Sequence, residues 1–169
     1  MELVKSPNPW LEKIVRPFDF DNLDAKKISG EMAQIMMAKN GIGLSANQVG
    51  LDAQIFIMRP LNHPEINKPF AVINPIILEV SEEAELAKEG CLSHIGLVLN
   101  IKRPTRLVAQ FLDIDAKECI LEFTGIDARC FLHEYDHLQG IEFTGRVSKL
   151  KLDMAKKKQK KLVQEFTNG

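Results

Sequence analysis

Leu132-His133-Glu134-Tyr135-Asp136-His137-Leu138-Gln139-Gly140 is the stretch of this sequence around which we expect the fold to form. Residues four apart lie about one turn apart on the same face of an α-helix, so His133 and His137 can offer imidazole nitrogens to one metal ion. Glu134 lies beside them, where its carboxylate can take a proton from water at the metal. Two of the four histidines flank a glutamate at this spacing, which favours an HExxH metal site over a solvated helix with chance histidines.

The helix that carries this stretch is predicted to run from Thr124 to Gln139, with Gly140 as its stop. Its first residues, Thr-Gly-Ile-Asp, have the Ser/Thr-x-x-acid pattern typical of a helix start. A buried pair of ligand histidines needs partners for the second ring nitrogens. The carboxylates of Glu89 and Asp136 are the candidates for that role.

The composition is that of an ordinary soluble protein, because 45% of the 169 residues are hydrophobic and 27% are charged. We therefore predict one catalytic domain over residues 1–169. The net charge of -1 gives no overall attraction to DNA or to a membrane. Three cysteines form no paired framework, and we find neither a spanning apolar run nor a signal pattern. A cytoplasmic monomer is expected.

The rest of the chain predicts an α+β fold, in which mixed, mostly antiparallel sheets surround the HExxH helix between N-terminal and C-terminal helices. Apolar spacing predicts the first main helix over Asp24–Lys39. Pro60–Pro69 is expected to be a loop and Ser81–Lys88 an exposed acidic segment. Runs of β-branched and aromatic residues predict strands, the second broken at Asn74-Pro75 and the last three in one antiparallel sheet. These strands are Ala53–Arg59, Phe70–Val80, Leu97–Ile101, Thr105–Asp113 and Glu118–Phe123.

Residues 149–169 form a Lys-rich segment that we expect to be a helix within the same domain. Its lysine cluster, Lys156–Lys161, is most often a solvated face, and binding to phosphate-rich RNA of the ribosome is the alternative. The apolar residues are spaced by multiples of four, which predicts one narrow stripe resting on the body. They are Leu150, Met154, Leu162 and Phe166.

The third metal ligand decides between classes of HExxH enzyme. An extended HExxHxxGxxH site needs a histidine at the position of Phe143. A thermolysin-type site needs a glutamate on a following helix, but Glu142 is too close and Glu165 lies in the Lys-rich tail. Cys91 is then the best candidate, since one thiolate and two imidazoles leave a coordination position open, as a catalytic site requires. His94 has a Cys-x-x-His spacing but no second ligand pair nearby, so we do not assign it to a metal.

Three motifs in a fixed order give a resemblance to the peptide deformylase family. The family carries Gly-x-Gly-Leu-Ala-Ala-x-Gln, Glu-Gly-Cys-Leu-Ser and His-Glu-x-x-His-Leu segments. Here they read GIGLSANQ from Gly41, EGCLS from Glu89 and HEYDHL from His133. The similarity runs from the Pro-Asn-Pro opening into the C-terminal helix, and the lack of large insertions resembles the shorter, bacterial type.

The resemblance implies one divalent metal ion held by Cys91, His133 and His137, with Fe(II) expected natively and zinc, nickel or cobalt also able to bind. The implied substrate is the formyl-methionine end of a nascent polypeptide, cleaved to formate and a free amine. Glu134 would take a proton from the attacking water and return it to the leaving nitrogen.

The resemblance also implies the remaining site residues. The Gln48 amide and the Leu92 backbone N–H would donate to the oxyanion of the tetrahedral intermediate. A further set would line or border the methionine pocket and the groove for the peptide backbone. It comprises Ile42, Gly43, Glu89, Gly90, Ile126, Arg129 and Cys130.

The sequence departs from the family pattern at several positions without losing a ligand, the base or an oxyanion donor. Ser45 replaces a usual alanine, Leu132 a usual glutamine and Ala116 a common turn glycine. The run from His94 to Asn100 also differs. Arg129 stands at a commonly apolar position, where it either narrows the pocket or points to solvent.

Two other functions compete with deformylation. An HExxH peptidase would cut internal peptide bonds, but the missing third His or Glu argues against it. A non-catalytic, ribosome-associated metal protein would use the lysine tail, but Glu134 and Gln48 argue against it, because a structural metal site needs neither a base nor an oxyanion donor.

Overall fold

The computed structural model describes the backbone of residues 1–167 and the side chains of residues 1–161. Within this range the predicted α+β fold is confirmed: strands β2 to β7 follow one another, and the α-helices lie before and after the strands. In chain order the elements are η1 (Pro9–Glu12), α1 (Ala25–Ala38), β1 (Gly43–Ser45), η2 (Ala46–Val49), β2 (Ile55–Met58), β3 (Phe70–Val80), β4 (Ala84–Cys91), β5 (His94–Pro104), β6 (Arg106–Leu112), β7 (Glu118–Thr124), α2 (Gly125–Leu138), η3 (Phe143–Arg146) and α3 (Lys149–Thr167).

The described strands form a five-stranded sheet in the order β1-β2-β3-β6-β7 and a separate β4-β5 hairpin. All five pairings among them are antiparallel. The break predicted at Asn74-Pro75 is a register shift between Ile73 and Ile76 within the continuous strand β3. Asn74 has a positive φ there and bonds the backbone of Phe18 through its amide.

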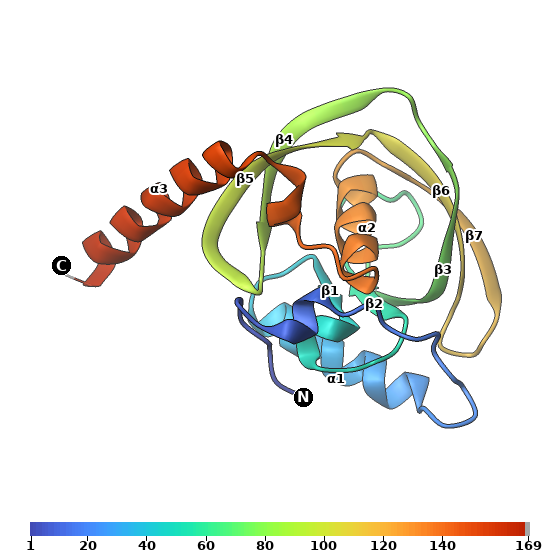
Figure 1. Ribbon diagram of the computed structural model, residues 1–169. Helices are drawn as coiled ribbons and strands as arrows, with labels where there is room; N and C mark the ends of the chain where they lie inside the picture. Colours follow the sequence, from blue (N-terminus) through green and yellow to red (C-terminus); the bar gives the residue numbers. More distant parts are fainter. Residues whose placement is uncertain (168–169) are drawn as a thin grey trace.

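Helix α2 lies inside the curve formed by β3, β6, β7 and the β4-β5 hairpin (Figure 1). Phe131 of α2 is fully buried, with its ring centroid 5.0 Å from that of Phe56 and 5.2 Å from that of Phe123. Strand β2 is buried on both faces, since Phe56 belongs to the α2 core and its neighbour Ile57 to the core around α1. Alternating side chains on one strand thus join both helices to the sheet.

The start of α2 is where the sequence predicts it, but the predicted cap is wrong. The Thr124 side chain makes no capping hydrogen bond. Asp127 is buried and turns away from the helix, where its carboxylate accepts from the backbone N–H groups of Leu61 (2.7 Å) and Asn62 (3.0 Å). The acidic residue therefore anchors the loop after β2 to the helix.

The β4-β5 hairpin corrects one prediction. The acidic segment is exposed as predicted, since none of residues 81–88 is buried, and its second part forms the start of β4. Strand β5 pairs with β4 instead of joining β6 and β7 in one sheet, so that prediction is wrong. The polar residues Glu85, Lys88 and Glu89 do not alternate with apolar ones along β4, so the sequence carries no period-two pattern that would reveal the strand.

Helix α3 projects from the body beyond β5 (Figure 1) and carries a different stripe from the predicted one. Leu150 is 71% exposed and Met154 is 64% exposed, whereas Leu152 and Ala155 pack against the apolar cluster under the hairpin. A spacing of four residues drifts about 40° around the helix at each step, so a strict four-residue series leaves the buried face. The other two predicted stripe residues, Leu162 and Phe166, lie outside the described side chains.

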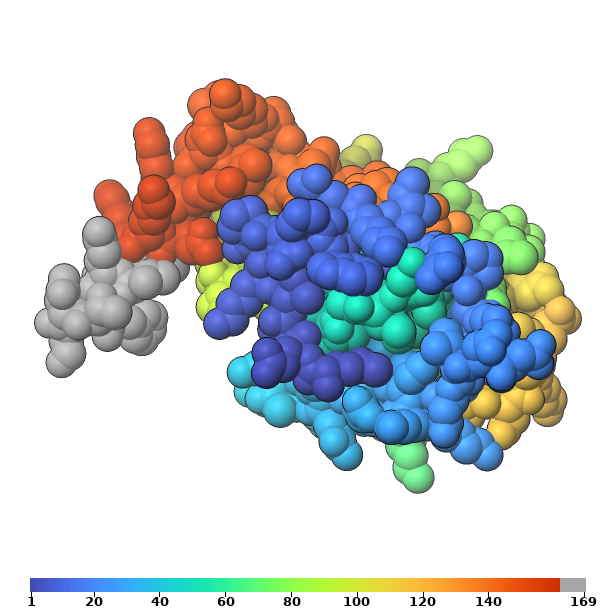
Figure 2. Space-filling view, turned by 60° about the horizontal axis from the view of Figure 1, so that its bottom comes forward, coloured from blue at the N-terminus to red at the C-terminus, as the bar shows by residue number. Residues whose placement is uncertain are grey.

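The N-terminal segment covers one side of the molecule, beside the blue helix α1 and the teal residues near position 50 (Figure 2). The Val4 N–H donates to the Gln48 carbonyl (2.7 Å), and the Ser6 N–H donates to the Ser93 carbonyl (2.9 Å). This segment therefore holds both η2 and the turn between β4 and β5 in place. No helix in the described part of the chain is long and apolar enough to span a membrane.

Candidate metal and catalytic site

A cleft of about 360 Å³ lies between the segment before β1, the β4-β5 hairpin and α2. This volume falls within the usual range for small-molecule sites. His137 is fully buried and does not line the cleft. Every other site residue expected from the sequence lines it. These residues are Ile42, Gly43, Gln48, Glu89, Gly90, Cys91, Leu92, Ile126, Arg129, Cys130, His133 and Glu134.

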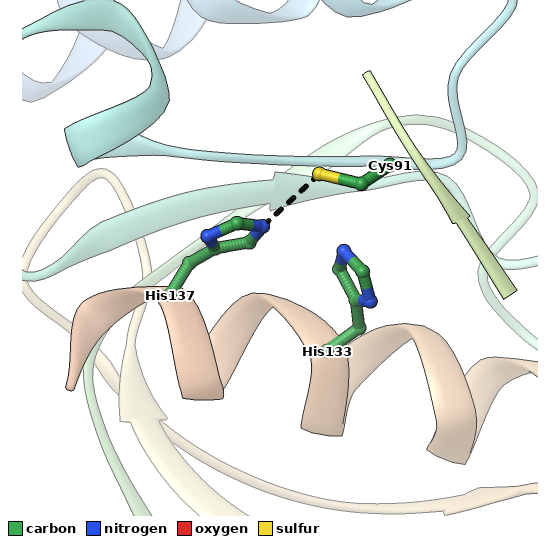
Figure 3. Close-up of side chains that lie close together, drawn as sticks. All are labelled: Cys91, His133 and His137. Atoms are coloured by element: carbon green, nitrogen blue, oxygen red, sulfur yellow. Dashed lines mark hydrogen bonds between the residues drawn. The ribbon is translucent and has the colours of Figure 1, made fainter. Parts of the chain in front are cut away.

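Cys91, His133 and His137 point towards one another (Figure 3). Cys91 ends β4, and the histidines come from successive turns of α2. One potential ligand atom from each side chain lies within 4.8 Å of the others, and Cys91 Sγ is 3.3 Å from His137 Nε2. One thiolate and two imidazoles form a donor set suited to zinc, iron and similar divalent ions. The group fits a metal ion.

Glu89 connects this group to two buried arginines. Glu89 Oε2 is 3.1 Å from His133 Nδ1, so the predicted partner of that ring is in place. Glu89 Oε1 accepts from Arg103 Nε (2.6 Å) and from Arg129 Nη1 (2.7 Å). Arg129 also donates to backbone carbonyls of both hairpin strands, each at 2.8 Å. Arg129 therefore does not point to solvent.

Asp136 is not the partner of a ligand ring. Its carboxylate accepts from Arg103 Nη1 at 2.8 Å and from Arg146. The Nδ1 atom of His137 is buried and has no hydrogen-bond partner among the described protein atoms. The Asn47 amide instead donates to the His137 backbone carbonyl at 2.5 Å. His94 lies opposite Cys91 in the hairpin register and lines the cleft, but it pairs with Glu142 and is not part of the ligand group.

Burial and hydrogen bonding shift the pKa values of these groups in different directions. Burial alone would raise the pKa of Glu89, but hydrogen bonds from His133 and Arg103 outweigh it and hold the value at about 2. Burial alone would lower the pKa of His133, but hydrogen bonds with Cys91 and Glu89 raise it to about 10, so a metal ion that binds this ring would displace its proton. Burial, followed by the positive charge of His133, lowers the pKa of His137 well below its usual value. A neutral His137 keeps a nitrogen lone pair available.

Glu134 is only 4% exposed, and burial raises the pKa of its carboxyl group although His133 and Ser45 oppose the shift. Its Oε2 accepts from Ser45 Oγ at 2.7 Å. A Cβ atom added at Gly43 would lie 2.3 Å from Glu134 Oε1, so glycine makes room for the carboxylate. A raised pKa suits a group that exchanges protons near neutral pH.

The Gln48 amide is oriented by a backbone contact. Its Oε1 accepts from the Ser45 N–H at 2.8 Å. Its NH₂ group consequently faces the hairpin, with Nε2 3.3 Å from Cys91 Sγ and 3.1 Å from Ser93 Oγ. Leu92 occupies the turn between β4 and β5 at the cleft wall.

Residues that contact the site but were not assigned to it from the sequence include Ser45, Ser93 and Arg103. The inward face of β5 carries Leu97, Leu99 and Ile101, and Arg103 is the next residue in this alternation. Period-two alternation over β5 was therefore a signal that Arg103 is buried. Ser93 carries no such signal, because its contact depends on the turn that brings it to Gln48.

Comparisons with known proteins agree on one family. The family model described as polypeptide deformylase matches residues 1–153. A peptide deformylase of Maricaulis maris is 36% identical over 161 residues, which cover 95% of this chain and 92% of that protein. A peptide deformylase of Mesorhizobium japonicum is 35% identical over 167 residues, covering 99% and 95%.

Solved structures give the same result at the level of the fold. The crystal structure of peptide deformylase from Ehrlichia chaffeensis superposes with a TM-score of 0.86 at 35% identity, covering 99% of this chain and 98% of that one. A structure of the protein from that organism in complex with actinonin also has a TM-score of 0.86, at 36% identity, with 95% and 96% covered.

Proposed function

The chain belongs to the peptide deformylase family, and we propose on this basis that Cys91, His133 and His137 hold the divalent ion of a hydrolase that removes the N-formyl group from nascent polypeptides. The supporting observation is that a thiol, two imidazoles and a buried carboxylate converge on one cleft. A structural metal site needs no such carboxylate beside its ligands. The products are formate and a polypeptide with a free amino group.

A divalent ion bound by these ligands would act as a Lewis acid and lower the pKa of a water molecule to near neutrality. Glu134 takes a proton from the water that attacks the formyl carbon and delivers it to the nitrogen as the C–N bond breaks. The Gln48 amide and the Leu92 N–H donate hydrogen bonds to the formyl oxygen as it gains negative charge. The protein walls of the cleft have a lower dielectric constant than water, which strengthens both contacts.

We assign the methionine side chain to the part of the cleft lined by Ile42, Gly43, Ile126 and Cys130, where the Cys130 thiol donates to the Ile42 carbonyl at 3.3 Å. Burial raises the pKa of the Cys130 thiol, so this residue stays uncharged. Arg129 borders the pocket, but its guanidinium bonds to Glu89 and to backbone carbonyls. Its charge is thereby offset, which keeps the pocket suited to an apolar side chain. Gly90 leaves the adjoining backbone open to the substrate chain.

Finer parts of the proposal concern the ion and the partners. Fe(II) is the proposed native ion, since a thiolate with two imidazoles suits iron as well as zinc, nickel and cobalt. The exposed lysines within Lys156–Lys161 on the projecting helix α3 are proposed to contact ribosomal RNA. The enzyme would then act as a monomer in the cytoplasm, at the site of translation.

The test is formate release from formyl-Met-Ala-Ser by protein purified without oxygen and loaded with Fe(II) or Ni(II). We expect turnover with either ion and none after chelation. The acetylated peptide is the matched control substrate. Cleavage of an internal peptide bond without formate would favour an HExxH peptidase, and no formate from the metal-loaded protein would refute deformylation.

A further inference from the structure

Ser45 is a fully buried residue of β1 whose side chain faces α2. Gly43 lies two positions earlier on the same strand and therefore faces the same way. Both residues contact Glu134, because Gly43 lies against Oε1 and the Ser45 hydroxyl lies 2.7 Å from Oε2. The two oxygens of the carboxylate thus meet different surroundings.

Glu134 Oε2 is engaged by Ser45, whereas Oε1 receives no hydrogen bond from any residue whose side chain is described. In that part of the chain Oε1 is not one of the fully buried polar atoms that lack a partner, so it keeps some access to the cleft. Since Glu134 lines the cleft, Oε1 is the oxygen left to meet a ligand there.

We propose that Ser45 is a positioning residue that holds Glu134 through Oε2, so that Oε1 is the atom that accepts the proton during deformylation. A hydrogen bond to a carboxylate is stronger than one between neutral groups, so a buried hydroxyl can fix the rotation of a short acidic side chain. The inference rests on the proposed function, because it assigns a role to one atom of the proposed base.

Ser45 also makes a second, separate contact through its backbone. Its N–H donates to Gln48 Oε1 at 2.8 Å, which turns the Gln48 NH₂ group towards Cys91. Replacement of the side chain leaves this backbone bond in place. Ser45→Ala therefore separates the effect on Glu134 from any effect on Gln48.

A competing role for the hydroxyl is purely structural. Ser45 Oγ lies 2.9 Å from the Glu134 backbone carbonyl as well as 2.7 Å from Oε2. A hydroxyl has one proton, so it donates to one of these acceptors at a time. A bond only to the carbonyl would affect stability and leave the chemical step unchanged.

The experiment compares kcat, KM and metal content of the wild-type enzyme and Ser45→Ala, both loaded with Ni(II), on formyl-Met-Ala-Ser. We expect kcat to fall about tenfold, the scale of losing one hydrogen bond to a charged group. KM and bound metal should stay the same. Alanine is smaller than serine and has no polar group to bury, so the variant is expected to fold; urea unfolding checks this.

Ser81→Ala is the matched control. The Ser81 hydroxyl donates to the Glu83 carbonyl at 2.7 Å and accepts from the backbone N–H of Thr105 at 3.1 Å, and it does not line the cleft. This variant should lose stability but keep kcat. An unchanged kcat in Ser45→Ala, or a loss explained by a higher KM or by lost metal, would overturn the inference. A wild-type enzyme that releases no formate would overturn the proposed function together with this inference.

Discussion

Helix α2 and the β4-β5 hairpin both contribute proposed metal ligands, but they are held in place by different forces. Almost all of α2 is buried, and its apolar residues pack into the main core between the sheet strands. The hairpin stands apart from the five-stranded sheet, and Glu89 is the one buried residue of β4. Apolar packing in the main core thus fixes His133 and His137. Cys91 lies on β4, whose one buried residue is charged, and packs against the smaller apolar cluster around Leu97, Leu99 and Ile101.

Charged contacts between the hairpin and α2 add to the limited apolar packing of the hairpin. Glu89 lies on the hairpin and bonds to Arg129 of α2, while Arg103 of the hairpin bonds to Asp136 of α2. Two ion pairs therefore join the hairpin to the helix close to the ligand group. The hairpin supplies the acid in one pair and the base in the other. The site therefore combines two ligands that apolar packing holds in place, His133 and His137, with a third, Cys91, whose position is sensitive to changes of charge.

The largest effect on turnover is expected from a change on α2 that leaves the apolar packing and the ion pairs intact. Glu134→Gln keeps the size of the side chain and removes the proposed base, so kcat should fall about 10²- to 10⁴-fold. Metal content, measured by atomic absorption, should equal that of the wild type. A variant with near-normal turnover would show that another group accepts the proton.

Phe131→Ala tests the apolar packing of α2. Because this ring is fully buried between Phe56 and Phe123, its removal should lower the free energy of unfolding by about 3–5 kcal/mol. Urea denaturation followed by circular dichroism measures the loss. Ile120→Ala, at a site on β7 that is 56% exposed, is the control. Similar losses for the two variants would contradict the packing described for α2.

Glu89→Gln tests the charged contacts between the hairpin and α2. The change leaves Arg103 and Arg129 buried without their shared carboxylate, which should cost about 3 kcal/mol in the free energy of unfolding. Because Glu89 also contacts His133, metal affinity should fall about 10- to 100-fold in a chelator competition. Glu79→Gln, which affects an exposed pair with Arg106, is the matched control. Unchanged metal affinity would mean that the hairpin is positioned without this network.

The smallest effect on turnover is expected from changes on α3, which belongs neither to α2 nor to the β4-β5 hairpin. Lys156, Lys157 and Lys158 are exposed, so their joint change to Gln should leave kcat on a small peptide within about twofold, as surface changes usually do. Ribosome co-sedimentation at low salt should weaken. Changes of three exposed lysines elsewhere, Lys27, Lys102 and Lys117, provide the control. Equal binding by all three proteins would remove the proposed ribosome contact.

The sequence predicted the elements whose signals are local. The HExxH spacing on a helix, the boundaries of α1 and the loop before β3 all follow from short-range patterns. Cys91 and Gln48 were found through ordered motifs, and both line the cleft with Glu134.

The remaining contacts depend on how distant segments meet. Ser45 and Glu134 are 89 residues apart, and Arg103 and Asp136 are 33 apart. Period-two alternation shows which side of a strand faces inward, but it does not show which charged group lies opposite. The stripe predicted on α3 was wrong at Leu150 and Met154 for a related reason, since the hairpin against which the helix packs determines which of its residues are buried.

The most direct test of the proposed centre is the absorption spectrum of the Co(II)-loaded protein. A thiolate ligand gives Co(II) a charge-transfer band in the near ultraviolet, so the wild type should show that band. Cys91→Ser should lose the band, whereas Cys119→Ser and Cys130→Ser, which change the other two cysteines, should keep it. A band that persists in Cys91→Ser would contradict the account, because the thiolate that binds the metal would then be a different residue.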